Sequence, residues 1–174
     1  MRKAVASSGV ALLWLPATSL AAETAAAPPD ARALLGRLHP ALVHFPIALI
    51  VVAVVAEALC IARKDGRYAD AARFMVTAAA WISIPAAATG FLRAGNITMD
   101  ATTQHLFAVH RIAGIATPVL IFLCAGLAEG VRRSGQIWEL MLYRAVLLLS
   151  AVSAVVAAYY GGEIVFGAGF FRLW

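Results

Sequence analysis

Four long apolar runs constrain the fold of this chain more than any other feature of its sequence. They lie near residues 41–62, 72–92, 106–128 and 142–161. Each is close to the roughly 20 residues that an α-helix needs to cross a bilayer. Such runs are too long and too evenly apolar for the strands of a membrane barrel. We therefore expect an all-α fold, an up-and-down bundle of four transmembrane helices joined by short connections.

The composition agrees with a membrane protein. Hydrophobic residues make up 63% of the 174 positions, and charged residues make up 13%. A soluble domain of this length cannot bury so much apolar surface. The net charge of +5 comes from short basic clusters beside the apolar runs, with no basic stripe interleaved with aromatics. This pattern indicates membrane topology and not nucleic-acid binding.

The N-terminal segment has the layout of a secretory signal peptide. A basic start at Arg2 and Lys3 precedes a short apolar stretch over residues 10–15 and small residues at 19–22. We assign residues 1–22 to a signal peptide, because the apolar stretch is too short to span a bilayer. An uncleaved anchor is the alternative. An Ala/Pro-rich linker over residues 23–34 then precedes a four-helix domain over residues 35–174.

The basic residues predict the direction of the helices. The connections expected inside the cell carry seven: Arg63, Lys64, Arg67, Arg73, Arg132, Arg133 and Arg144. The segments expected outside carry five: Arg32, Arg37, Arg93, Arg111 and Arg172. This bias and the signal peptide agree, so we expect a multi-pass protein of the bacterial inner membrane with both termini outside the cytoplasm.

All four histidines open helices that run inward from the external face. His39 and His44 begin the first span, and His105 and His110 begin the third, with a spacing of five in both pairs. Five residues turn a helix about 140° beyond a full turn, so one pair cannot chelate an ion from one helix face. We therefore expect ligation across helices, with His44 facing His110.

Several chemistries are open to these histidines. Two imidazoles from facing helices are what the iron of a non-covalent haem b requires, with His39 and His105 as propionate partners or proton carriers. A copper or zinc site with Glu163 as an oxygen ligand is a second possibility, and a quinone pocket is a third. The simplest alternative is that each histidine is an interfacial residue without a role, because an imidazole tolerates the headgroup region.

Glu57 is the one acidic side chain placed deep within a span. A charge there costs about 2.5–3.5 kcal/mol on insertion scales. We expect it to pair with an arginine of the inner connections, with a proton-relay role as the alternative.

Short motifs resemble an uncharacterised bacterial membrane family, domain of unknown function 2231. The main motif is the run GRLHPALVHFPIAL over residues 36–49, supported by Thr89-Gly90, His110-Arg111 and GGEIVFG over residues 161–167. The resemblance implies envelope electron transfer with c-type cytochromes as partners, although this chain has no Cys-x-x-Cys-His for covalent haem. It departs from the family pattern at Arg93, where many relatives are acidic, and at Ala168, where many have histidine.

Two functions follow as the leading hypotheses. The first is a non-covalent haem or metal redox module, and the second is a cofactor-free membrane anchor or assembly subunit. A transporter is less favoured, because the chain has few spans and one deep charge. The sequence contains no catalytic triad, phosphate loop or nucleotide fingerprint, so we do not expect an enzyme.

Overall fold

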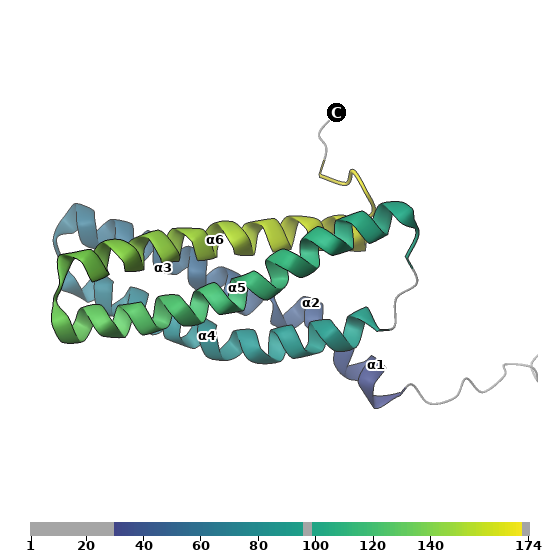
Figure 1. Cartoon of the computed structure of the whole chain (residues 1–174), viewed down its shortest axis with the longest axis horizontal. Coiled ribbons are helices and arrows are strands. Elements are labelled where there is room, and N and C mark those ends of the chain that lie inside the picture. The colour runs from purple at the N-terminus through teal and green to yellow at the C-terminus, as the bar shows by residue number, and fades with distance from the viewer. Residues whose placement is uncertain (1–29, 96–98, 172–174) are drawn as a thin grey trace, which may run out of the picture.

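The structure of the chain, a computed structural model, is an all-helical bundle (Figure 1). It describes residues 30–95 and 99–171. The helices of this part are α1 (Ala31–Gly36), α2 (His39–Leu42), α3 (His44–Arg63), α4 (Gly66–Ala94), α5 (Ala101–Ser134) and α6 (Ile137–Phe166). By length and composition, α4, α5, α6 and the continuous stretch Ala31–Arg63 can each cross a membrane. The expected bundle of four long apolar helices is confirmed.

The bundle has two distinct ends (Figure 1). The α3–α4 and α5–α6 turns lie together at one end, which we call the turn end. Helix α1, the end of α4, the start of α5 and residues 167–171 lie at the other, which we call the histidine end. We use this name because α2 and the N-terminal part of α5 carry His39 and His110 there. The helices therefore alternate up and down.

Local signals explain where the helices start and stop. At the turn end, Lys64 adopts a left-handed conformation with φ of 53°, which ends α3. Asp65 then caps α4 by accepting the Arg67 N–H at 3.0 Å. Gly135, with φ of 65°, ends α5, because glycine adopts the left-handed region without a Cβ penalty. Asp100 caps the start of α5 by accepting the Thr103 N–H at 2.7 Å.

A short helix lies at the N-terminal side of the described residues. Residues 31–34, assigned above to the linker, belong to helix α1. Asp30 caps this helix by accepting the Arg32 N–H at 3.3 Å, which gives the short segment a defined start. The predicted signal peptide over residues 1–22 and the rest of the linker up to residue 29 lie outside the described residues.

The two hairpins, α3–α4 and α5–α6, repeat the same pattern of burial. Each residue of the first hairpin corresponds to the residue 71 positions later in the second hairpin, so His39 corresponds to His110. Buried residues match in eight pairs: Pro46 and Thr117, Ile50 and Ile121, Ala53 and Cys124, Glu57 and Ala128, Ala72 and Tyr143, Val76 and Leu147, Ala79 and Ser150, and Ser83 and Ala154. The bundle is thus built from two structurally equivalent hairpins.

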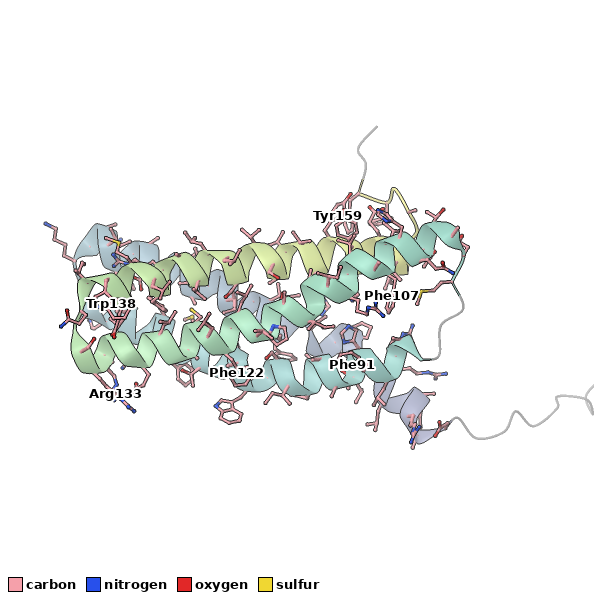
Figure 2. The ribbon with its side chains drawn as sticks, viewed as in Figure 1. Phe91, Phe107, Phe122, Arg133, Trp138 and Tyr159 are labelled. Carbon is pink, nitrogen blue, oxygen red and sulfur yellow. The ribbon has the colours of Figure 1, made fainter. Side chains whose placement is uncertain are left out.

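The packing of the helices follows this repeat. Each hairpin packs along its own length, and the hairpins meet where α4 contacts α5 and where α3 contacts α6. If the two hairpins are interchanged, so that α3 replaces α5 and α4 replaces α6, the α4–α5 contact becomes the α3–α6 contact. The hairpins are therefore related by a pseudo-twofold axis that runs along the bundle. Large apolar side chains cover the outer surface, including Phe91, Phe122 and Trp138, which project from the ribbon in Figure 2. An apolar exterior is what lipid requires.

Candidate functional site

His39 is held at the histidine end by a carbonyl of the neighbouring helix. Its Nδ1 lies 2.9 Å from the backbone oxygen of Ala86 on α4. A carbonyl oxygen only accepts, so the Nδ1 atom carries the hydrogen and donates it. In the neutral ring, the Nε2 atom then presents a lone pair.

His110 repeats this arrangement in the second hairpin. Its Nδ1 donates to the backbone oxygen of Ala157 on α6, also at 2.9 Å, and 47 positions separate histidine from alanine in both cases. Ala86 and Ala157 occupy matching positions of the repeat. The two histidines are therefore equivalent in position, tautomer and hydrogen bond.

Two glycines let the rings reach these carbonyls. The residue four positions after a helical carbonyl carries the side chain that would cover it. Here that residue is Gly90 for Ala86 and Gly161 for Ala157. A Cβ at Gly90 would lie 2.9 Å from Cε1 of His39, and a Cβ at Gly161 would lie 3.0 Å from Cε1 of His110. Any larger residue would push the ring away.

The two imidazoles lie next to each other across the pseudo-twofold axis. Their ring centroids are 6.2 Å apart and their planes are inclined at 78°. Both rings are partly buried. Two metal–nitrogen bonds of about 2.0 Å each, with half a ring at either end, span about the same distance. The spacing is that of an edge-to-face aromatic pair, and it also allows two imidazoles to bind one metal ion where both Nε2 atoms face it.

A small apolar cavity lies beside His39. Its volume is about 80 Å³, and residues from all four long helices line it. The lining follows the repeat: Val43 and Gly114, Pro46 and Thr117, Ile47 and Pro118, Ser83 and Ala154, Ala86 and Ala157, and Ala87 and Ala158. A cavity with such paired walls lies on the axis that relates the hairpins.

The structure pairs His110 with His39 and not with His44. His44 is exposed on the outer surface, and so is His105 in the second turn of α5. The 140° between positions five apart explains this outcome, because only one member of each pair can face the bundle. The expected facing of His44 and His110 is therefore not the arrangement in the structure, and the assignment of His44 and His110 as cofactor ligands stays a prediction.

Glu163, expected as a possible oxygen ligand, lies buried near the end of α6. Its Oε1 accepts the Phe171 N–H at 3.1 Å, and its Oε2 accepts the Gly169 N–H, so its carboxylate holds the C-terminal segment. Within residues 30–95 and 99–171, no group of three or more His, Cys, Asp or Glu side chains is placed to hold a metal ion. Among the described residues, the histidine end thus offers His39 and His110 as candidate ligands and no third.

Glu57 forms the expected ion pair at the opposite end of the bundle. Arg144 of α6 donates from Nε to Oε1 of Glu57 at 2.7 Å, and the Glu57 side chain is 7% exposed. Arg144 is one of the basic residues assigned above to the inner connections. The prediction of an arginine partner is confirmed.

The sequence contains a signal for the proximity of His39 and His110. At the offset of 71, His39 matches His110, Arg73 matches Arg144, and Gly90 matches Gly161. The equal spacing of five drew attention to a different register, in which His39 matches His105. The glycines and alanines that support the rings are the residues that sequence reasoning missed.

Comparison with known proteins identifies the family. The model of a family described as predicted membrane protein (DUF2231) matches residues 37–170. No curated protein and no solved structure gives a significant match. The family match covers both hairpins, all four long helices and both members of the histidine pair. The chain belongs to the DUF2231 family of predicted membrane proteins.

Proposed function

We propose that this protein is a membrane redox module that holds one metal centre between Nε2 of His39 and Nε2 of His110. One observation carries the proposal: two equivalent histidines, each fixed through Nδ1 by a helix carbonyl, lie 6.2 Å apart across the axis of the bundle. A hydrogen bond from Nδ1 to a carbonyl is the usual support of a metal-ligating imidazole, because it fixes the tautomer and the orientation of the ring.

The iron of a b-type haem is the first candidate for this centre. His39 and His110 would hold this iron, because it needs two imidazoles from facing helices and no further protein ligand. Gly114, Ala87 and Ala158, which line the cavity on the pseudo-twofold axis, would border the group once the hairpins separate. Arg93, whose backbone lies close to Gly36 at this end, would supply a cation for a propionate. When bound, the haem supplies one-electron chemistry.

The size of the cavity supports a second candidate, a single Cu(I) ion. Ligand pockets commonly have about 300–1,000 Å³, so a haem requires the hairpins to separate at this end. A copper ion needs no such movement, because imidazole suits copper and the site already has the spacing for two nitrogen ligands. Zinc is less suitable, since its sites use three or four protein ligands.

The membrane setting supports a role in the cell envelope. We propose that the histidine end faces outward in the bacterial inner membrane, because the turn end carries the larger number of basic residues and the N-terminal segment resembles a signal peptide. A c-type cytochrome or another envelope redox protein is then the expected electron partner.

An absorbance spectrum and metal analysis of the detergent-purified protein test this proposal. We expect either a haem Soret band or about one copper per chain. The His39→Ala, His110→Ala double variant should lose the bound haem or copper. The matched His44→Ala, His105→Ala variant should keep it. Wild-type protein that carries neither haem nor copper, and takes up neither when supplied, would support the cofactor-free anchor instead.

A further inference from the structure

One hydroxyl group distinguishes the surroundings of the two paired histidines. Thr89 is buried on α4, and its side-chain oxygen lies 2.8 Å from the backbone oxygen of Pro85 and 3.0 Å from that of Ala86. A carbonyl oxygen only accepts, so the hydroxyl donates its hydrogen toward both. The Ala86 oxygen also accepts from Nδ1 of His39 at 2.9 Å. Thr89 and His39 therefore donate to the same carbonyl.

The Ala86 carbonyl receives more donors than it has lone pairs. Gly90 follows Ala86 by four positions within α4, so its backbone N–H also points at the Ala86 oxygen. Together with the His39 ring and the Thr89 hydroxyl, three donors share the two lone pairs of this oxygen. Each of these hydrogen bonds is weaker than it would be with two donors.

The second hairpin lacks the third donor. The position equivalent to Thr89 is Tyr160, 71 positions later. Threonine is short enough to bond a carbonyl of the preceding turn, whereas tyrosine carries its hydroxyl at the far end of a ring. Among residues 30–95 and 99–171, no hydroxyl donates to the Ala157 oxygen, which accepts from Nδ1 of His110. The two histidine bonds have the same length, so the difference lies in what else each acceptor receives.

The hydrogen bond at Nδ1 affects how well each ring binds a metal at Nε2. A strong bond from Nδ1 to its acceptor raises the basicity of the ligating nitrogen, and a weaker bond leaves a poorer ligand. His39 also borders the apolar cavity, which gives its ring space to move.

We propose that Thr89 is a positioning residue that makes His39 the weaker and exchangeable ligand of the pair, so that the centre opens on the side of His39. The ligand role rests on the proposed function of the histidine pair. The inequality of the two hydrogen bonds does not, because it depends only on the groups that donate to Ala86 and Ala157.

Another threonine of α4 provides a matched control. Thr77 donates to the backbone oxygen of Arg73 at 2.9 Å, which is the same bond to the preceding turn that Thr89 makes to Pro85. Thr77 is exposed and lies toward the turn end, away from the histidines. Replacement by valine removes the hydroxyl at either position. Any effect of valine on α4 itself would therefore appear in both variants.

NMR of the imidazole N–H protons tests the two hydrogen bonds. The sample is the detergent-purified full chain without haem or metal, labelled with the heavy nitrogen isotope in its histidines. A stronger bond moves the proton resonance downfield, so we expect the Nδ1 proton of His39 upfield of that of His110. Thr89→Val should move the His39 resonance most of the way toward that of His110. Thr89→Ser should keep the wild-type position, and Thr77→Val should move neither resonance.

Carbon monoxide binding by the reduced protein tests the exchange of His39 where the haem or copper centre is present. Ferrous haem and Cu(I) both bind carbon monoxide, which competes with the weaker protein ligand. We expect Thr89→Val to raise the Kd for carbon monoxide about threefold or more, because a better-supported His39 is harder to displace. Thr77→Val should keep the wild-type Kd.

Two results would overturn the proposal. One is a His39 proton resonance that stays in place in Thr89→Val or moves equally in Thr77→Val. The other is a protein that holds its centre but shows the same Kd for carbon monoxide with threonine and valine at position 89. A protein with neither haem nor copper would contradict the proposed function instead, and the NMR result would still decide whether the two hydrogen bonds differ.

Discussion

The histidine end and the turn end of the bundle use the same repeated frame in different ways. At the histidine end, both hairpins contribute the same set: a histidine, an alanine carbonyl and a glycine. At the turn end, Arg73 and Arg144 occupy matching positions, but Glu57 is matched by Ala128. Arg73 therefore pairs within its own helix with the exposed Asp70, whereas Arg144 pairs across hairpins with Glu57.

This difference separates two kinds of contact between the hairpins. A repeat that stays symmetric places equivalent groups on both sides of its axis, as with His39 and His110. A repeat that loses its symmetry places opposite charges on one side, as with Glu57 and Arg144. An ion pair also joins α3 to α6. Among the described residues, no ion pair joins α4 to α5.

Removing the acid from the asymmetric pair should have the largest effect on stability. Glu57→Ala leaves the Arg144 guanidinium without its partner in a largely apolar setting. We expect a loss of about 3 kcal/mol in the free energy of unfolding, because an unpaired charge remains. Denaturant titration in mixed micelles measures it. The double variant Glu57→Leu, Arg144→Leu should recover most of the loss, and a double variant as unstable as the single one would contradict this explanation.

A methyl group at the symmetric end should disturb the histidine site. Gly161→Ala places a Cβ 3.0 Å from Cε1 of His110, so the ring must move and its hydrogen bond to Ala157 weakens. We expect a loss of about 1 kcal/mol and weaker cofactor retention. Gly126→Ala is the control, since a Cβ there meets nothing within 4 Å and alanine favours a helix. If both variants have the same thermal midpoint, Gly161 is not needed to make room for the His110 ring.

Restoring the missing acid should make the turn end symmetric. Ala128→Glu puts a carboxylate at the position equivalent to Glu57, where Arg73 is the matching base. We expect a change in stability within about 1 kcal/mol, because the new charge gains a partner. The same substitution in an Arg73→Leu background should be clearly destabilising. Equal unfolding midpoints in the two backgrounds would show that the hairpins are not equivalent at this depth.

The caps of α4 and α5 should give the smallest effect, a dependence on pH. Bonds from the Arg67 side chain and backbone lower the pKa of Asp65, and the Thr103 N–H lowers the pKa of Asp100. A lowered pKa means that the cap stabilises the fold above the unfolded value of 3.8 and that this contribution is lost as the pH falls through the folded value. The thermal midpoint of the Asp65→Asn, Asp100→Asn variant should therefore fall less than that of wild type between pH 6 and about 3. Parallel curves would contradict this.

Sequence reasoning was strongest where bilayer physics acts on single residues. The length of the apolar runs identified four helices, and the cost of a buried charge predicted an arginine partner for Glu57. It was weakest on which face of each helix lies inside. In a soluble protein, polar residues mark the outer face, but here lipid-facing positions such as Trp81 and Phe74 are as apolar as the core. No polar residues therefore indicate how α2 and α3 are rotated about their axes. For the same reason, they do not indicate which of His39 and His44 faces the bundle interior.

Replacement of each histidine by glycine, followed by addition of free imidazole, tests the central claim most directly. The account predicts that His39→Gly and His110→Gly lose the haem or copper signal and that external imidazole restores it, because each variant leaves a space of the right shape opposite an intact ligand. The signal of His44→Gly should stay at the wild-type level without imidazole. Loss of the signal in His44→Gly with full retention in His39→Gly would contradict the pairing of His39 with His110.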